Sequence, residues 1–167
     1  KNKPPIHAMD LIPVDLNSLL FTLENLLAEL SELESDPASE TYQEAAAARA
    51  KFIQEKLFDK DAGIYLDYDF VGDSLTQRSS LAMLYPLFAN CATQTQADQV
   101  AAHIKIHFLK PGGLVTTQVS SGEQWDYPNG WAPHQWIGVK GLMNYGHEDL
   151  AKAIAQNWLN LNEKVYR

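Results

Sequence analysis

Cysteine, basic residues and long apolar runs are all scarce in this sequence of 167 residues. The one cysteine, Cys91, stands in an apolar segment, so a disulfide framework and a cysteine metal site are excluded and a buried thiol is expected. His103 and His107 stand four residues apart, but no third ligand or glutamate stands at the spacing of a zinc site. We therefore expect neither a metal nor a cofactor.

Basic residues are outnumbered by acidic ones. Thirteen Lys and Arg face 21 Asp and Glu, which gives a formal net charge of −8, and no cluster of Lys and Arg interrupts the acidic surface. Nucleic acid and anionic membranes are therefore not expected as partners. The longest strongly apolar stretch, about 81–92, contains Pro86 and is too short to span a bilayer. Residues 1–5 are basic but no apolar run follows, so a secretory signal is expected to be absent or already removed.

Hydrophobic residues make up 46% of the chain and charged residues 20%, the balance of a folded domain with a sizeable core. Apolar residues at intervals of three and four predict six helices. The expected ranges are Val14 to about Glu34, Pro37 to about Phe58, Thr76 to Asn90, Thr95 to Leu109, Pro133 to Tyr145 and Glu148 to Tyr166. Between the second and third helices, alternation from Ile64 to Phe70 predicts one short strand or extended loop.

Helix boundaries and faces follow from the same pattern. Asp15 is the expected N-cap of the first helix, and Thr95 with Asp98 resembles a capping arrangement for the fourth. Pro86 is expected to kink the third helix, and Gly146 to close the fifth in the left-handed conformation. The first helix is amphipathic, and its apolar stripe comprises Leu16, Leu19, Leu20, Leu23, Leu27 and Leu30.

Short and long connections alternate, so the helices form three hairpins in series. This rhythm is typical of an α-toroid or an α-solenoid, and the absence of a shared sequence repeat favours the toroid. The fold class expected is all-α, about half of an (α/α)6 toroid, with long loops that carry function. The longest of these loops begins at Pro111 and runs to Gly130.

The segment from Gln124 to Pro133 concentrates two tryptophans, a carboxylate and two amides in a loop ahead of a helix. Sugar sites use this mixture, because indole faces stack on the C–H face of a pyranose while Asp, Asn and Gln hydrogen-bond its hydroxyls. A packed loop explains the same residues: Trp125 and Trp131 would then fill core gaps, and Asp126 or Asn129 would cap the helix. Composition alone leaves both interpretations open.

The same segment resembles the trehalase signature, Q-W-D-x-P-x-G-W-x-P, and matches all seven of its fixed positions. Other segments are similar in the same order, across about residues 10–167. They are Pro13 to Asn17, Gly63 to Asp69, Pro111 to Gly113 and Asn144 to Gly146. The resemblance implies glycoside hydrolase family 37, an (α/α)6 barrel that hydrolyses α,α-trehalose to glucose with inversion.

Members of that family are much longer than this chain, so residues 1–167 are expected to be a single partial domain. It would be the C-terminal-side portion of the barrel, truncated at both ends. The family's general acid belongs to a Gly-Trp-Asp motif that would precede Lys1, and its general base to a Glu-Lys-Tyr motif expected beyond Arg167. Glu163 to Tyr166 resembles the second motif but lies too early and lacks the contiguous sequence, so the base is not assigned to Glu163. No catalytic residue is therefore expected within the chain.

The function expected is that of a segment of an inverting trehalase, which contributes substrate-cavity wall and is inactive alone. Its expected substrate-binding residues are Trp125, Asp126, Gln124, Asn129 and Trp131. Trehalose is the expected small-molecule partner, and self-association through unpaired helix faces is also expected. The alternatives are another α-toroid glycosidase and a non-catalytic helical carbohydrate-binding or scaffold module. The resemblance of 112–117 to the periplasmic type favours the periplasm over the cytoplasm.

Overall fold

The computed structural model describes residues 8–167 and contains six α-helices within them. The helices are α1 (Val14–Leu33), α2 (Ala38–Lys56), α3 (Tyr85–Phe88), α4 (Gln94–His107), α5 (Ala132–Asn144) and α6 (Glu148–Tyr166), with 3₁₀ turns η1 (Ala8–Asp10) and η2 (Leu81–Leu84). The six-helix order expected from the sequence is confirmed. The basic residues 1–5, on which the expectation about a secretory signal rests, lie outside the described part.

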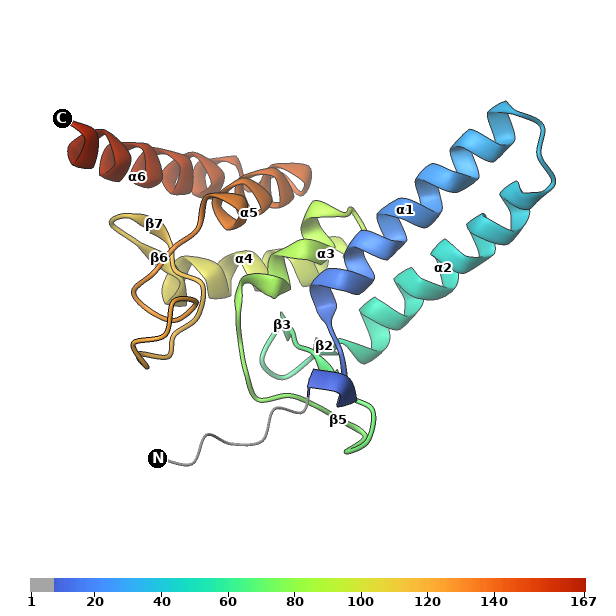
Figure 1. Cartoon of the computed structure of the whole chain (residues 1–167), viewed down its shortest axis with the longest axis horizontal. Helices are drawn as coiled ribbons and strands as arrows, with labels where there is room; N and C mark the ends of the chain where they lie inside the picture. The colour runs from blue at the N-terminus through green and yellow to red at the C-terminus, as the bar shows by residue number, and fades with distance from the viewer. Residues whose placement is uncertain (1–7) are drawn as a thin grey trace.

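Two long helical pairs stand at opposite sides of the molecule, α1 with α2 and α5 with α6 (Figure 1). Between them, α3 packs against both α1 and α5. The odd-numbered helices therefore form one row, and α2 and α6 lie behind its two ends. This arrangement of an inner row with outer partners is part of an α/α toroid.

Within residues 8–167, seven strands of two residues each lie in the segments that precede or join the helices. β1 (Leu11–Ile12), β4 (Tyr68–Asp69) and β5 (Ser74–Leu75) form one antiparallel sheet, β2 (Phe58–Asp59) pairs with β3 (Ile64–Tyr65), and β6 (Leu109–Lys110) pairs with β7 (Gly113–Leu114). The short strand or extended loop expected at 64–70 is two short strands: β3 pairs with β2, and β4 pairs with both β1 and β5. These small sheets hold the long loops against the helices.

The third helix begins later than the pattern predicts. Residues 76–80 are not helical, because β5 and the bond from the Thr76 N–H to the Asp67 carbonyl hold the chain extended. Helical structure starts at η2, where the Ser80 hydroxyl accepts a hydrogen bond from the Ala82 N–H. Pro86 lies in the first turn of α3, where its missing N–H costs nothing, so the expected kink is wrong.

The expected caps of α1 and α4 are also corrected. α1 begins at Val14, as expected, but its N-cap position is Pro13 and not Asp15, and the Val14 N–H donates to the Asp67 carboxylate at 2.9 Å. The cap of α4 is Thr93, which forms a reciprocal capping box with Gln96. At α1 the acceptor comes from a loop 53 residues further along the chain, and at α4 it is Thr93, two residues before the expected Thr95.

The core runs along the odd-numbered row and beneath the small sheets. Its largest fully buried side chains include Tyr65, Phe108, Met83 and Leu142. Cys91 is 2% exposed, as expected, and burial raises the pKa of its thiol to about 12. No helix in residues 8–167 is long and apolar enough to cross a membrane.

The leucine stripe of α1 does not face this core. Leu16, Leu19, Leu23 and Leu30 are each 45–51% exposed, while the buried positions of the helix are Val14, Asn17, Ser18 and Ala28. α2 covers the helix from the other side, where Arg49 makes a bidentate contact to Glu24 at 2.6 and 2.8 Å. A large apolar face of α1 is therefore open in this chain.

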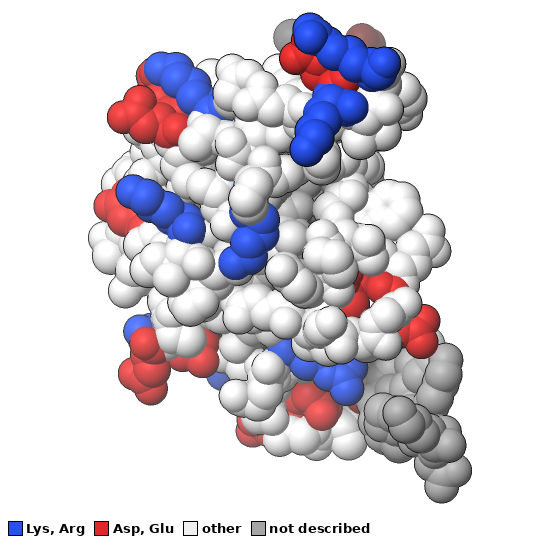
Figure 2. Space-filling view, turned by 90° about the vertical axis from the view of Figure 1, so that its left-hand side faces the viewer, with Lys and Arg blue, Asp and Glu red and all other residues white. Residues whose placement is uncertain are grey.

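The charged residues show no comparable segregation on the side of the molecule seen in Figure 2. Acidic and basic side chains lie beside one another in small groups, with uncharged surface between them. This face offers no extended patch of one sign.

Candidate functional site

The loop from Gln124 to Pro133 is fixed to the body of the protein by Gln135, in the first turns of α5. The Gln135 side chain is 4% exposed, accepts from the Leu114 N–H at 2.7 Å and donates to the Leu114 carbonyl at 2.8 Å. Gly130 lies against the same carbonyl, and a Cβ at this position would stand 2.5 Å from it. A side chain at 130 would push the loop away, so glycine is required there.

Asp126 organises the loop. One carboxylate oxygen accepts from the Thr117 hydroxyl at 2.9 Å and the other from the Ser121 hydroxyl. These two hydrogen bonds, Ser121 first, lower the pKa of Asp126. The side chain is therefore ionised near neutral pH and is suited to accept hydrogen bonds rather than to donate a proton.

Three aromatic rings stand beside Asp126. The rings of Trp125 and Trp131 stack with centroids 4.7 Å apart, and His134 meets Trp125 edge-on at 5.8 Å. Trp125 remains 54% exposed. Burial lowers the pKa of His134, whose Nδ1 has no hydrogen-bond partner among the described residues. The cluster thus presents an exposed indole that is held by two less exposed rings.

Trp125, Asp126 and His134 line a cavity of about 370 Å³, which we call the motif cavity. Its other lining residues are Asp15, Ser80, Leu81, Ala82, Tyr85, Thr116 and Thr117. The cavity lies at the N-terminal ends of α1, η2 and α5, and a bridge between Ser80 and Thr117 joins two of its walls. Helix N-termini carry partial positive charge and free N–H groups, which favour oxygen-rich ligands.

The five site residues predicted from the sequence fall into two groups. Trp125 and Asp126 line the cavity, and Trp131 packs behind Trp125. Asn129 instead supports the loop, because its carbonyl accepts from the Thr116 N–H and hydroxyl. Gln124 is exposed and is not among the lining residues.

Sequence reasoning did not select Asp15, Ser80, Tyr85, Thr117 or His134 for this site. Asp15 lies in a segment that resembles the family, and His134 directly follows the motif. The sequence therefore offered a reason to include both residues in the site. No sequence pattern marked Ser80, Tyr85 or Thr117 as site residues, because their segments reach the motif loop only through tertiary packing.

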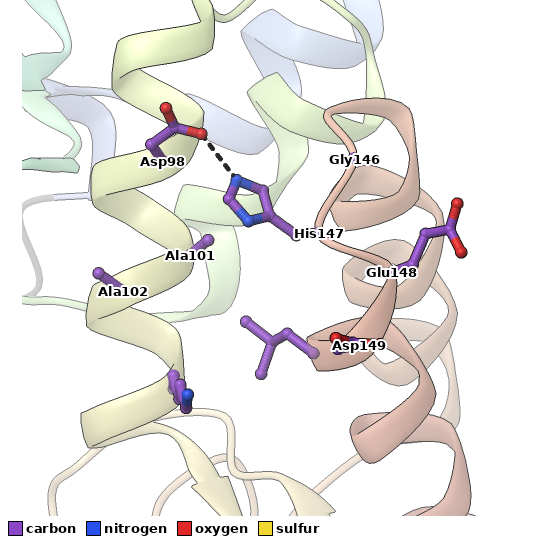
Figure 3. A pocket seen from close by; sticks show the side chains of 9 residues that line it. Asp98, Ala101, Ala102, Gly146, His147, Glu148 and Asp149 are labelled. Carbon is purple, nitrogen blue, oxygen red and sulfur yellow. Dashed lines mark hydrogen bonds and ion pairs between the residues drawn. The ribbon is translucent and has the colours of Figure 1, made fainter.

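A second hollow, of about 580 Å³, lies between α4 and the start of α6. Figure 3 shows His147 reaching across it to Asp98, with 2.9 Å between Nε2 and the carboxylate oxygen. It shares no lining residue with the motif cavity. We therefore place the candidate site at the motif cavity.

Solved structures define the class of fold. The chain is similar to neutral trehalase from Saccharomyces cerevisiae, with a TM-score of 0.82 and 30% identity over 90% of this chain and 31% of that one. It is also similar to a GH63 mannosylglycerate hydrolase from Thermus thermophilus, with a TM-score of 0.77 over 92% of this chain and 38% of that one. The sequence identity to that enzyme is 24%, so this similarity is evidence for the fold alone. The structure is thus part of an α/α toroid of the kind found in glycoside hydrolases.

Sequence comparison then gives the family. The trehalase family model matches residues 3–167, and the chain belongs to the trehalase family. Over 162 residues it is 42% identical to the periplasmic trehalases of Citrobacter koseri and Salmonella enteritidis. Those alignments cover 96% of this chain but 28% of each relative, so the chain spans less than a third of their length.

Proposed function

We propose that the whole protein hydrolyses α,α-trehalose to glucose with inversion and that residues 1–167 supply part of its sugar-cavity wall. One observation carries the proposal: Trp125 and Asp126, two fixed positions of the family motif, line the same cavity. That cavity lies at the N-termini of three helices. Family membership supports the proposed reaction, and the position of the cavity supports the part proposed for this segment.

The chemistry of the cavity supports a sugar ligand. The exposed indole of Trp125 offers an apolar face for the C–H side of a pyranose ring. Asp126, held by Thr117 and Ser121, still has lone pairs to accept hydrogen bonds from ring hydroxyls. Because both side chains are already fixed by neighbours, binding costs little further side-chain entropy.

Inverting hydrolysis needs one carboxylic acid to protonate the glycosidic oxygen and one carboxylate to activate water, about 6.5–9.5 Å apart. The family resemblance assigns both groups to positions outside residues 1–167. The lowered pKa of Asp126 agrees with a binding role, because a general acid must hold its proton near neutral pH. The role of this segment is therefore to bind and orient the sugar and not to transfer protons.

The periplasm is the proposed location, with the cytoplasm as the alternative. Its support is that the relatives from Citrobacter koseri and Salmonella enteritidis are named periplasmic trehalases.

The open leucine face of α1 supports a further part of the proposal, that residues 1–167 on their own self-associate. Leu19, Leu23 and Leu26 lie on that face, and each is 45–49% exposed. Contiguous apolar surface of this kind is normally covered in a folded protein. In the whole protein the remaining helices of the toroid would cover it.

The test is to express the full-length protein and to follow the products of purified sugars by NMR. Hydrolysis of trehalose with one β-glucose among the first products confirms the proposal. Hydrolysis of another α-glucoside but not trehalose identifies a different α-toroid glycosidase. Binding without any hydrolysis identifies a carbohydrate-binding module.

A further inference from the structure

Two buried polar atoms in the aromatic cluster of the motif cavity have no hydrogen-bond partner. They are Trp131 Nε1 and His134 Nδ1, two of the four buried side-chain nitrogen and oxygen atoms without a partner within residues 8–167. Both rings contact Trp125, one by stacking and the other edge-on. Buried polar groups in native proteins are normally hydrogen-bonded, and the exceptions gather at functional sites. The proposed function uses Trp125 but gives His134 no role.

His134 is the third residue of α5, and its half-buried side chain lines the motif cavity. Neither ring nitrogen makes a hydrogen bond within residues 8–167, and Nδ1 is enclosed, so Nε2 is the nitrogen that a ligand can reach. Burial lowers the pKa of His134, and the charge of Asp15 acts in the opposite direction with a smaller effect. The ring is therefore neutral near pH 7 and carries one N–H donor and one nitrogen acceptor.

Two other polar side chains reach the same cavity from the neighbouring helices. Asp15 lies in the first turn of α1 and Tyr85 is the first residue of α3. Burial, and after it the charge of Asp15, raises the pKa of Tyr85, so Asp15 acts on both Tyr85 and His134. Asp15 Oδ1 accepts from the Leu16 N–H at 2.7 Å, which leaves the other carboxylate oxygen for a ligand. No described residue hydrogen-bonds the Tyr85 hydroxyl.

The chemistry of these three groups selects the class of ligand. A carboxylate only accepts hydrogen bonds, whereas a phenol and a neutral imidazole can both donate and accept. A hydroxyl group suits each of them, because it can donate to Asp15 and take either role toward Tyr85 and His134. The formally charged residues of the cavity are Asp15 and Asp126, so an anion would be repelled. The cavity wall therefore suits the hydroxyls of a neutral sugar.

We infer that His134 is a substrate-contact residue that sets the sugar specificity of the motif cavity, because its imidazole hydrogen-bonds one hydroxyl of the bound ring. This inference rests on the proposed function, which places a sugar in that cavity. Trp125 can recognise only the apolar face that many hexoses share. His134, edge-on to that indole, adds a contact that depends on the hydroxyl pattern.

The test compares the full-length protein with its His134→Leu variant, in which an apolar side chain replaces the imidazole. His107→Leu is the control, because His107 is exposed on α4 and does not line the motif cavity. The quantity measured is kcat/KM for trehalose and for derivatives that lack the hydroxyl at C2, C3, C4 or C6 on both rings. Both rings are changed because trehalose is symmetric and would otherwise bind with its intact ring at His134.

For trehalose, kcat/KM of His134→Leu is expected to be about tenfold or more below that of wild type and His107→Leu. For one of the derivatives this difference is expected to disappear, because the hydroxyl that His134 contacts is already absent. His134→Gln is expected to recover part of the activity, since its amide reaches the position of Nε2. The Tm of His134→Leu is expected to stay at the wild-type value, because a buried nitrogen without a partner is removed.

Two outcomes overturn the inference. In one, His134→Leu hydrolyses trehalose with wild-type kcat/KM. In the other, it loses the same factor on trehalose and on every derivative, which identifies a structural role.

Equilibrium dialysis with labelled glucose and its monodeoxy forms repeats the comparison without turnover. A protein that leaves trehalose intact, but whose glucose binding depends on His134 and on one hydroxyl, contradicts the proposed function and not the contact. Glucose binding that is equal in wild type and His134→Leu contradicts the contact.

Discussion

At the scale of single residues, Asp126 links loop structure to ligand binding. Asp126→Asn in the full-length enzyme keeps the shape of the side chain but replaces a charged acceptor by a weaker neutral one. If Asp126 contacts the sugar in the transition state, kcat/KM for trehalose is expected to fall roughly tenfold to a hundredfold. Steady-state kinetics at pH 7 provides the measurement.

The melting temperature separates this role from a purely structural one. A loop support alone would lower the Tm of Asp126→Asn and leave kcat/KM nearly unchanged. The pKa of Asp126 is lowered in the folded state, so its contribution to stability is present above the unfolded pKa and is lost as pH falls through the folded one. The difference in Tm between wild type and Asp126→Asn should therefore disappear in acid.

Gln135 tests how the motif loop is held. In Gln135→Leu, the buried N–H and carbonyl of Leu114 both lose their side-chain partner, which is expected to cost about 2 kcal/mol or more of unfolding free energy. Thermal or urea denaturation of the full-length protein measures this loss. Asn144→Leu is the matched control, because that amide is exposed and donates to two carbonyls at 3.2 Å. An equal loss in both variants would contradict the special role of Gln135.

At the scale of elements, Asp67 shows how a distant loop starts a helix. Asp67→Ala removes the acceptor for the Val14 N–H, so α1 is expected to lose about 1 kcal/mol of stability. Asp67→Asn keeps an acceptor oxygen there and removes a buried charge. Since burial is the main cause of the raised pKa of Asp67, this variant is expected to be at least as stable as wild type at pH 7.

The pH dependence gives a control for this interpretation. A carboxyl whose folded pKa is raised binds more protons in the folded state, so its effect on stability becomes less favourable as pH rises from the unfolded pKa through the folded one. The advantage of Asp67→Asn over wild type should therefore shrink as pH falls through that window. A constant difference across it would show that the charge of Asp67 is not the cause.

At the scale of the whole molecule, the open leucine face of α1 predicts the behaviour of the 167-residue chain by itself. It is expected to form dimers or larger species at micromolar concentration, as measured by light scattering after size exclusion. Leu19→Glu with Leu26→Glu should restore the monomer, while Ile106→Glu, on α4 and 69% exposed, should not. A monomeric wild-type chain would contradict this expectation.

The same chain is expected to release no glucose from trehalose. The resemblance places the proton donor and the water-activating carboxylate outside it, and without them neither step of the inverting mechanism is catalysed. A coupled glucose assay on chain purified from a host without trehalase activity is the measurement. Release above the level of a matched Trp125→Ala preparation would refute the expectation.

Local sequence patterns were sufficient to predict the long helices and the loop motif. Periodicity predicts the long helices to within a few residues, because apolar spacing is a local property. The seven fixed positions of one loop indicate the trehalase family without any information on tertiary contacts. Trp125 and Asp126 could be predicted as site residues because both are fixed positions of that motif. Where the pattern was short or interrupted, as at 76–90, tertiary packing overrode it.

Contacts between distant segments and the exposure of helix faces depend on the packing of the whole chain. The first N–H of α1, that of Val14, donates to Asp67, 53 residues away, and the motif cavity joins Asp15, Ser80 and His134 from three separate segments. No local pattern encodes such contacts, because they depend on how helices and loops pack in space. For the same reason, amphipathicity showed that α1 has a leucine stripe, but the packing of α2 and α3 left that stripe exposed.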